Sequence, residues 1–377
     1  MPYGECKIAG GKLASIDLMV ESGQLRQIKL RGDFFIFPEP RTTEVIAGIQ
    51  AALDGLPADL DATALSAHIA AAVPFGIELL GTDPDAIAVA VRRAVTGQAD
   101  YGSVPDAARV GSLSSKEIDR LTEGWRAMPW RLIAEEPLPP AVNVALDEVL
   151  TNRVAKGESP PTLRFWRWSS PAVIVGRCQS VANEVDREAA KSLGITVVRR
   201  MTGGGAMFLQ PHGAITYSLF LPESALAGLS IRQSYELCES WVVRGLRELG
   251  VDAHHVPIND IACSAGKIGG AAQARRSGVV LHHTTMAYDM DPGEMVRVLR
   301  IGREKLKDKA VTSAQKRVSP LVLQTGKRRE EIVDHLFESF RNRFGGTVSP
   351  LTESERAEAD RLVRDKYGSP EWTNEFE

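Results

Sequence analysis

Alternating apolar and polar residues predict a first compact unit at the N-terminal end of the chain. Residues 5–36 alternate on both sides of a turn at Glu21-Ser22-Gly23, which is typical of two or three antiparallel strands. Helical spacing follows over 42–54, 61–73 and 84–96. The polar segment 99–125 has no strong period, although Ser115 and Asp119 suit the start of a short helix. We therefore predict a small α+β domain over 1–110 and a linker over 111–125.

A second pattern begins near Trp130 and predicts a larger unit, 126–377. Helical spacing covers 139–157, 183–194 and 231–250. Strand-forming residues dominate 162–168, 172–177, 195–200 and 214–221. A β-meander is predicted over 259–290, and helices dominate from 293 onward. These elements are too irregularly mixed for a doubly wound parallel sheet, so the fold class is α+β.

Composition and charge exclude several classes of protein. The chain has 377 residues and a formal net charge of -3, whereas a nucleic-acid-binding protein usually has a basic domain. No apolar run reaches the roughly 18 residues of a membrane span, and the N-terminus lacks the pattern of a secretory signal. The four cysteines have no CxxC spacing, which disfavours a disulfide framework or a zinc site. We expect a cytoplasmic protein of two domains that binds neither nucleic acid nor membranes.

Three consecutive glycines follow a predicted strand that ends in Arg199 and Arg200. In Thr202-Gly203-Gly204-Gly205 the bare backbone can approach a ligand closely, and successive N–H groups can bind an anion. The two arginines add bidentate recognition of phosphate or carboxylate. The segment is not a P-loop, because it lacks the GxxxxGK[ST] spacing. A β-bulge or a tight barrel corner would require the same glycines, so both interpretations remain open.

A second cluster of chemical interest lies in "NDIACSAGKIGGAAQARR". Lys267 stands between glycines, where it can contact a phosphate or stabilise charge in an acyl-transfer transition state; a solvated hairpin lysine is the alternative. Asn259 and Asp260 can orient a substrate or hold a magnesium ion, or can form an Asx turn. His282 and His283 alternate faces of a predicted strand, so one of them points inward, where a core histidine is the simplest interpretation.

Four separated motifs resemble those of lipoate–protein ligases, whose catalytic core is similar to that of biotin–protein ligases and octanoyltransferases. They are "FWRWSSPAVIVGRCQS", "VVRRMTGGGAMF", "NDIACSAGKIGGAAQARR" and "LHHTTM", and the resemblance covers roughly residues 126–345. Residues 3–36 resemble the accessory domain of the same family, which here precedes the catalytic domain. The C-terminal segment "AEADRLVRDKYGSPEWTNEF" resembles the handover to that accessory domain. We therefore predict that the C-terminal tail lies close to the N-terminal unit.

The resemblance implies a fold and a reaction. The fold implied is a catalytic domain of mixed and antiparallel sheets with flanking helices, plus the small α+β accessory domain. ATP and Mg²⁺ would activate lipoate to lipoyl-AMP, and the lipoyl group would then pass to a lysine of an acceptor. Acceptors would be the lipoyl domains of 2-oxoacid dehydrogenase complexes or the H protein of glycine cleavage.

The resemblance also implies roles for individual residues. Lys267 would be catalytic, by electrostatic stabilisation rather than covalent attack, and Asp260 would be the metal ligand. Trp168 would pack on the lipoyl chain, with Trp166 as the alternative. The remaining residues implied to bind substrate or nucleotide are Arg177, Arg199, Arg200, Thr202, Gly203, Gly204, Gly205, Ala206, Met207, Phe208, Asn259, Gly269, Gly270 and His283.

One departure and two rival functions qualify this resemblance. Many members of the family have a histidine where this chain has Leu209, and His212 is the nearest substitute. An octanoyltransferase that uses acyl carrier protein would need a cysteine nucleophile, and Cys263 lies four residues before Lys267. A buried structural role for Cys263 is the simpler expectation. A non-catalytic lipoyl-binding protein is the third possibility.

Overall fold

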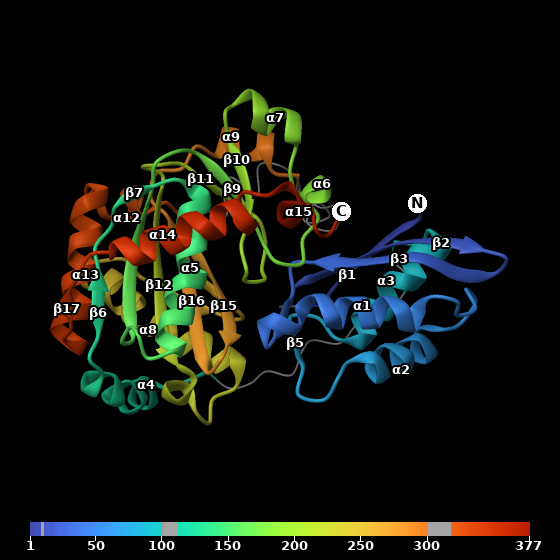
Figure 1. Cartoon of the computed structure of the whole chain (residues 1–377), viewed down its shortest axis with the longest axis horizontal. Helices are drawn as coiled ribbons and strands as arrows, with labels where there is room; N and C mark the ends of the chain where they lie inside the picture. The colour runs from blue at the N-terminus through green and yellow to red at the C-terminus, as the bar shows by residue number, and fades with distance from the viewer. Residues whose placement is uncertain (9–10, 100, 102–111, 301–317) are drawn as a thin grey trace.

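The N-terminal unit is a three-stranded antiparallel sheet on which two helices, α1 and α3, pack, with α2 lying against those two helices (Figure 1). The computed structural model describes residues 1–8, 11–99, 101, 112–300 and 318–377. The sheet contains β1 (Tyr3–Lys7), β2 (Leu13–Glu21) and β3 (Gln24–Gly32). Its helices are α1 (Thr42–Leu53), α2 (Ala62–Ala72) and α3 (Pro84–Thr96), and β4 (Phe35–Phe37) pairs with β5 (Glu78–Leu80). The predicted strands and helices of this unit are confirmed, whereas the proposed boundary near residue 110 lies outside the described residues.

The larger unit is built on one long mixed sheet. Along its main path the strand order is β13 (His254–Val256), β14 (Asp260–Cys263), β15 (Gly266–Arg276), β16 (Val279–Ala287), β12 (Ala214–Pro222), β8 (Thr162–Trp168), β6 (Arg131–Ile133) and β17 (Thr347–Val348). The pair β6–β8 is parallel, whereas β8–β12 and β12–β16 are antiparallel. The short β7 (Pro137–Leu138) pairs with β8, off that path.

Helices cover both faces of this sheet. Leu163 and Phe165 of β8 belong to the apolar core beneath α8 (Ile231–Glu248) and α13 (Arg329–Phe344). The alternate residues Trp166 and Trp168 belong to the core beneath α5 (Pro140–Ala155) and α14 (Glu353–Leu362). A strand that is buried on both faces reads as a continuous apolar run, as "TLRFWRW" nearly does. The predicted α+β class with mixed and antiparallel sheets is confirmed.

A second, small sheet carries the glycine loop. Its order is β10 (Thr196–Arg199), β9 (Ala172–Val175) and β11 (Met207–Leu209), with β10–β9 parallel and β11–β9 antiparallel. The three glycines connect β10 to β11 across β9. The predicted helix over 183–194 is two short helices, α6 (Val181–Glu184) and α7 (Arg187–Ser192). The helix breaks because Val185 is extended and the Asp186 side chain accepts from Ala189 N as a new N-cap.

The remaining elements complete the outer layers. The helix predicted near Ser115 is α4 (Ser115–Glu123), whose N-cap is Ser114 in a capping box with Glu117. Helices α9 (Pro292–Val298), α12 (Leu321–Thr325) and α15 (Pro370–Thr373) follow β16, and residues 301–317 lie outside the described part of the chain. Five residues, Val363–Tyr367, form a π-helical turn between α14 and α15. Within the described ranges, no helix is both long and apolar enough to cross a membrane.

An apolar contact joins the two units. Phe35, Phe37 and Leu80 of the N-terminal unit form one buried cluster with Ile231, Tyr235, Ile258, Ala271 and Ala272 of the larger unit. The Phe35 and Tyr235 ring centroids are 5.8 Å apart. Burial of β4 therefore fixes the N-terminal unit against α8 and β15.

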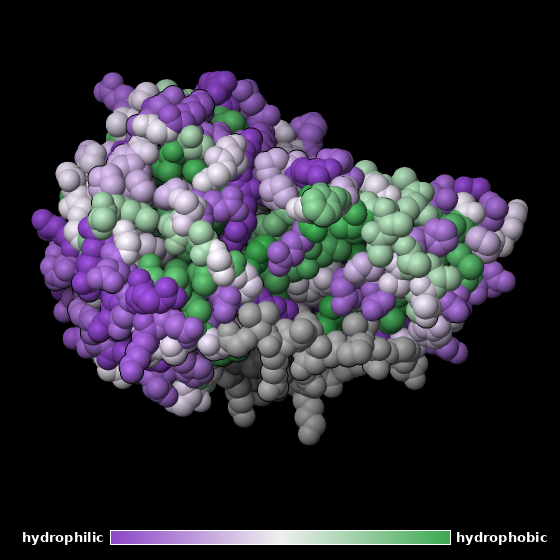
Figure 2. Space-filling model, turned by 90° about the horizontal axis from the view of Figure 1, so that it is seen from below, coloured by the Kyte–Doolittle hydropathy of each residue, from purple (hydrophilic) through white to green (hydrophobic). Residues whose placement is uncertain are grey.

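Seen from below, the larger unit is mainly hydrophilic at its surface, whereas the N-terminal unit exposes more hydrophobic residues (Figure 2).

The C-terminal tail also holds the N-terminal unit. Lys29 Nζ donates to the main-chain oxygen of Glu377 at 2.7 Å, and Arg31 Nε donates to that of Phe376 at 2.6 Å. Thr43 Oγ1 donates to the Glu375 carboxylate at 2.9 Å. Figure 1 shows the C-terminus beside the N-terminal unit. The predicted proximity of the tail to this unit is confirmed.

Glu375 gives a pH-dependent test of this contact. Burial favours its neutral form, but the bonds from Arg177 outweigh burial and hold the pKa of Glu375 below its ordinary value. A depressed carboxyl pKa stabilises the fold above the unfolded pKa, and this contribution disappears as the pH falls through the folded value. We expect Glu375→Gln to lower the free energy of unfolding by about 1–3 kcal/mol at pH 7, with a smaller loss near pH 3. Urea unfolding at both pH values measures it.

The matched control is Glu371→Gln, an exposed glutamate on α15 one turn away. We expect its urea midpoint to equal that of the wild type at both pH values. An equal loss of stability for Glu375→Gln at pH 7 and pH 3 would contradict the assignment to the ionised carboxylate.

Candidate functional site

A cavity of about 490 Å³ lies where the glycine loop, β14, β15, β16 and the N-terminal unit meet. It brings together most of the predicted site residues. Those on its wall are Arg200, Gly204, Gly205, Ala206, Met207, Phe208, Asn259, Asp260, Lys267, Gly269, Gly270 and His283. The other five, Trp168, Arg177, Arg199, Thr202 and Gly203, do not line it. The cavity therefore brings together residues of the second, third and fourth sequence motifs, although not all of their side chains line it.

Arg200 shapes the glycine loop. Its buried guanidinium donates to Gly203 O at 2.6 Å, to Gly205 O at 3.0 Å and to Thr202 Oγ1 at 2.9 Å. A fourth bond reaches Ile174 O on β9. Burial lowers the pKa of Arg200 to about 10. Four of the five guanidinium N–H groups therefore donate hydrogen bonds within the protein. Arg200 holds the loop in its conformation rather than binding a ligand with these groups.

The glycines serve two different neighbours. A Cβ on Gly203 would lie 2.6 Å from Phe34 O and 2.7 Å from Phe35 Cδ1, so this position accommodates the N-terminal unit. Gly204 has a φ of +90° and lies against the Phe35 ring. A Cβ on Gly205 would meet only Asp33 Oδ2, at 3.8 Å, beside the cavity. The first two glycines therefore permit contact between the units, and the third leaves space within the cavity.

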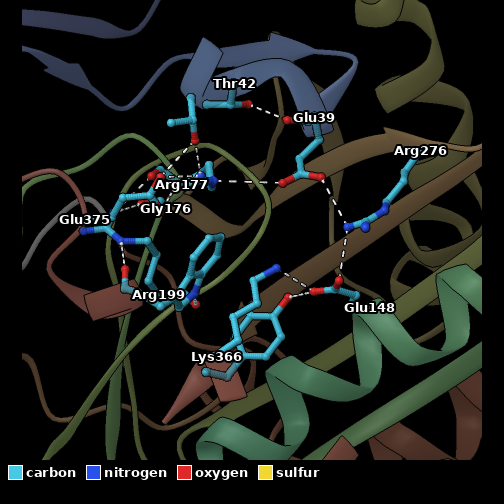
Figure 3. Close-up of polar contacts among 12 residues, drawn as sticks. Glu39, Thr42, Glu148, Gly176, Arg177, Arg199, Arg276, Lys366 and Glu375 are labelled. Atoms are coloured by element: carbon cyan, nitrogen blue, oxygen red, sulfur yellow. Dashed lines mark hydrogen bonds and ion pairs between the residues drawn. The ribbon is translucent and has the colours of Figure 1, made fainter. Parts of the chain in front are cut away.

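Arg177 and Arg199 face the C-terminal tail (Figure 3). Arg177 donates to both oxygens of Glu375, at 2.7 and 2.8 Å, and lies 4.3 Å from the centroid of the Trp372 ring. Arg199 donates to Gln179 O at 2.6 Å and to Thr373 O at 2.7 Å. Burial lowers the pKa of Arg199 to about 10. The two guanidinium groups therefore connect the C-terminal tail with the β9–α6 loop and the N-terminal unit.

A buried ionic chain runs beside Arg177 from the N-terminal unit to α5. Glu39 lies 3.9 Å from Arg177 Nε and 3.8 Å from Arg276 Nη1, and Figure 3 shows it between the two. Arg276 Nη1 also lies 3.2 Å from Glu148 Oε1, whose other oxygen accepts from Lys366 at 2.7 Å. Burial raises the pKa of Glu39 although these cations oppose it. The chain adds polar contacts to the apolar contact at β4.

Lys267 and Asp260 form an ion pair at the cavity wall. The distance from Lys267 Nζ to Asp260 Oδ1 is 2.7 Å, and the two side chains are 46% and 32% exposed. They come from adjacent strands of the β14–β15 hairpin. Gly270 leaves room for them, because a Cβ there would lie 3.3 Å from Lys267 Nζ. A half-exposed cation beside a carboxylate can both bind an anion and approach a reacting carbonyl.

The donors for a divalent cation are few. Mg²⁺ is commonly bound through one or two carboxylates together with substrate phosphates, and Asp260 with neighbouring Asn259 fits that requirement at the cavity wall. Asn259 Nδ2 donates to Ala271 O. The side-chain oxygen of Asn259 is the atom of this amide that can act as a metal ligand. Among the described residues, no group of three or more His, Cys, Asp or Glu side chains could form an all-protein metal site.

His283 belongs to a buried polar chain that sequence reasoning missed. Its Nδ1 is 2.7 Å from Asp147 Oδ2 on α5, and its Nε2 is 2.9 Å from Thr202 Oγ1. Asp147 also accepts from Ser218 on β12. Both histidines of "HHTT" are buried, because the sheet is covered on both faces; burial lowers the pKa of His282 well below its usual range. Asp147 is thus connected to the glycine loop through His283 and Thr202.

The N-terminal unit contributes cavity residues that were not predicted. Lys7, Lys12 and Asp33 line the wall. The only signal in the sequence is "KIAGGKL", a glycine pair between two lysines. Nothing in that local pattern indicates which surface of the larger unit it faces.

The cysteines and the substitute histidine lie elsewhere. All four cysteines are buried and none lines the cavity. Cys263 Sγ lies 3.4 Å from Ser319 Oγ in the sheet core, and burial raises the pKa of the Cys178 thiol to about 12. Leu209 is buried in the core, and His212 is exposed and does not line the cavity. The expected buried role of Cys263 is consistent with this position.

Comparison with known proteins identifies relatives of the larger unit. Residues 139–341 match the sequence model of the lipoyl protein ligase A/B catalytic domain. The octanoyltransferase LipM of Exiguobacterium sp. is 35% identical over 272 residues, which cover 64% of this chain and 97% of that protein.

Solved structures with similar folds include two lipoate–protein ligases. A bi-partite lipoate protein ligase of Thermoplasma acidophilum, studied with its E2 lipoyl domain, is 30% identical with a TM-score of 0.58, and the match covers 66% of this chain and 96% of that one. Lipoate-protein ligase A bound with ATP is 28% identical with a TM-score of 0.58, over 66% of this chain and 100% of that one.

Two glycines separated by one residue provide a test of the loop. We expect Gly203→Ala to lower the free energy of unfolding by about 1–3 kcal/mol, because its Cβ would overpack Phe34 and Phe35. Gly205→Ala is the control, since its Cβ meets no atom closer than 3.8 Å. Neither residue has a positive φ, so only the available space differs. Urea unfolding measures both; equal destabilisation would refute the division of roles.

Proposed function

We infer that this chain, which belongs to the lipoyl protein ligase A/B catalytic-domain family, is an ATP-dependent lipoate–protein ligase. One observation carries the choice within that family: the cavity combines the Lys267–Asp260 pair with the glycine loop, and no cysteine lines it. Attachment by adenylation needs positive charge and bare backbone, whereas attachment through a thioester needs an accessible thiolate.

The first step is activation of the acid. A lipoate carboxylate oxygen attacks the α-phosphorus of ATP, the bond from the α-phosphorus to the bridging oxygen breaks, and pyrophosphate leaves. Both reactants are anions, so Lys267 Nζ lowers their mutual repulsion. Asp260 and Asn259 would hold Mg²⁺, which supplies further charge neutralisation on the phosphates.

The glycine loop provides the surface against which the acyl-adenylate lies. Gly204 and Gly205 line the cavity, and Arg200 holds the loop in that conformation by donating to the carbonyls of Gly203 and Gly205. A loop fixed before the ligand arrives loses little conformational entropy on binding. Arg200 is therefore a positioning residue in this proposal.

The second step transfers the acyl group. The amine of an acceptor lysine attacks the carbonyl carbon of lipoyl-AMP, AMP leaves with the bonding electron pair, and the amine loses a proton. Negative charge develops on the carbonyl oxygen, where Lys267 Nζ can stabilise it without forming a covalent bond. The acceptor proposed is a lipoyl domain, the class of partner studied with the Thermoplasma acidophilum relative; the H protein of glycine cleavage is the other acceptor implied by sequence resemblance.

An octanoyltransferase is the second candidate, because the similar curated proteins include octanoyltransferases LipM. That reaction would place an octanoyl group on a thiolate before transfer. The positions of the four buried cysteines disfavour it. Cys263, nearest to Lys267 in sequence, has its sulfur directed to Ser319 and Gly266 O.

Lys267→Ala tests the ligase. We expect purified wild type to release pyrophosphate with ATP, Mg²⁺ and lipoate, and the variant to lose on the order of 100-fold or more of that rate. Lys156→Ala, at the exposed end of α5, should retain the wild-type rate. Release that does not depend on lipoate, or that survives in Lys267→Ala, would contradict the proposed role.

Cys263→Ala tests the alternative. We expect no octanoyl transfer from octanoyl-acyl carrier protein by the wild type, and an unchanged lipoate-dependent pyrophosphate release by the variant, because its sulfur does not reach the cavity. Transfer by the wild type that disappears in Cys263→Ala would replace the ligase with the octanoyltransferase.

A further inference from the structure

A chain of buried polar side chains connects β8 and α5 with the glycine loop. It begins at Trp166 Nε1 on β8, which donates to Ser218 Oγ on β12 at 2.9 Å. Ser218 Oγ donates to Asp147 Oδ1 on α5, also at 2.9 Å. The other carboxylate oxygen of Asp147 lies 2.7 Å from His283 Nδ1 on β16. All four of these side chains are buried.

The same chain continues into the loop itself. His283 Nε2 lies 2.9 Å from Thr202 Oγ1, which accepts from Arg200 Nε at 2.9 Å. Arg200 Nη2 then donates to the carbonyls of Gly203 and Gly205. Thr202 and Arg200 are buried as well. Hydrogen bonds therefore lead without a break from a carboxylate on α5 to the main chain of the glycine loop.

The two ends of this polar chain determine where its protons lie, because an indole Nε1 and a guanidinium Nε can only donate. Ser218 Oγ accepts from the indole, so its own proton goes to Asp147. Thr202 Oγ1 accepts from the guanidinium, so its proton goes to His283 Nε2. His283 is therefore protonated at Nδ1, which donates to Asp147. A proton on Nε2 would leave the buried Thr202 hydroxyl proton without an acceptor among the described residues, which is costly.

Asp147 is the only charged acceptor of the chain as described. It accepts from Ser218 on one oxygen and from His283 on the other. Arg164 on β8 supplies the opposite charge: burial lowers the pKa of Arg164 to about 10, and the attraction of Asp147 opposes that shift. A buried carboxylate with hydrogen-bond donors on both oxygens and a cation nearby is compensated for its loss of water.

We propose that Asp147 is a positioning residue of the glycine loop and acts through His283 and Thr202. The carboxylate keeps the His283 proton on Nδ1, so that Nε2 holds the Thr202 hydroxyl, and this hydroxyl holds Arg200 Nε. With Nε held, the plane of the guanidinium is fixed and its Nη2 meets the two loop carbonyls.

The polar chain acts on a ligand through the loop. Neither Asp147 nor Thr202 lines the cavity, whereas Gly204 and Gly205 do. A loop that is ordered before the ligand arrives loses less conformational entropy on binding. This inference rests on the proposed ligase function for the identity of that ligand, an acyl-adenylate, and adds residues to its site.

The first measurement needs no ligand. Nitrogen-15 NMR of the full chain identifies the protonated nitrogen of His283, and the amide resonances of Gly203 and Gly205 report the loop. We expect the wild type to carry the proton on Nδ1. In Asp147→Asn, Ser218 still donates to the amide oxygen, so the amide N–H faces His283 Nδ1 and should move the proton to Nε2, with both glycine resonances shifted. A wild-type proton on Nε2, or glycine resonances unchanged in the variant, would refute the inference.

The second measurement gives the effect on the ligand. The probe is a non-reactive sulfamoyl analogue of lipoyl-AMP, titrated into the full chain by calorimetry. We expect Asp147→Asn and Thr202→Val each to weaken its binding about tenfold, the order of effect of one charge-assisted hydrogen bond. Thr202→Ser keeps the hydroxyl and should stay within about threefold of wild type. The double variant of Asp147→Asn with Thr202→Val should also be weakened only about tenfold, because both changes interrupt one chain.

Thr151→Val is the matched control. It removes another buried hydroxyl of α5, which donates to the main-chain oxygen of Asp147 at 2.6 Å rather than to its carboxylate. Its affinity for the analogue should equal that of the wild type. An equal loss in Thr151→Val and Asp147→Asn would indicate a general packing effect and overturn the inference. So would a double variant weakened about 100-fold, which is the product of two independent effects.

Together the two measurements separate this inference from the proposed function. Wild type with the expected His283 proton, and with loop resonances that shift in Asp147→Asn, but without affinity for the analogue, would sink the ligase proposal and retain the positioning role. Wild type that binds the analogue with the same affinity as Asp147→Asn would do the reverse.

Discussion

The close approach of Phe34 and Phe35 to Gly203 and Gly204 is the contact on which the arrangement of this protein depends. A side chain at Gly203 would overlap this contact, so the bare backbone is what lets β4 reach α8 and β15. Once β4 is buried there, Asp33 and Lys12 are carried to the cavity wall. The same glycine loop that offers main chain to the cavity therefore also positions the second unit. Arg200 connects the two functions, because its guanidinium fixes the loop through the carbonyls of Gly203 and Gly205.

Polar and ionic contacts with the C-terminal residues 373–377 add to this apolar contact. Arg177 and Arg199 are buried cations, and taking a guanidinium out of water is costly unless acceptors replace the solvent. The C-terminal tail supplies those acceptors through Glu375 and the carbonyl of Thr373. Because Lys29 and Arg31 hold the last two residues, the tail is bound by both units at once. Residues 375–377 thus fix the N-terminal unit against the larger one, as the predicted proximity of the tail implied.

The sequence predicted elements with strong local patterns and failed where partners are distant. Strand 162–168 and helix 84–96 agree with β8 and α3 to the residue, since burial of both faces or a clear capping signal defines each locally. The glycine motif and the lysine motif, both named from the sequence as candidate site residues, line one cavity in the structure. By contrast, Arg177 and Arg199 looked suited to phosphate, and only the folded chain reveals that residues near 375 occupy them. Asp147 was missed for the same reason, because its link to His283 joins α5 to β16 across the sheet.

Relatives with different reactions share this fold, so the reaction must be argued from side chains at the cavity. A thioester route requires a thiolate that a carrier-bound acyl group can reach, and burial in apolar surroundings works against both ionisation and access. Each cysteine here is buried in packed structure. An adenylate route requires cations and main-chain donors, which the hairpin of β14 and β15, the glycine loop and the N-terminal unit place around one space. In the proposed ligase reaction the N-terminal unit would have a chemical reason to be tightly docked, because residues of both units line the cavity and this wall forms only when the units are in contact.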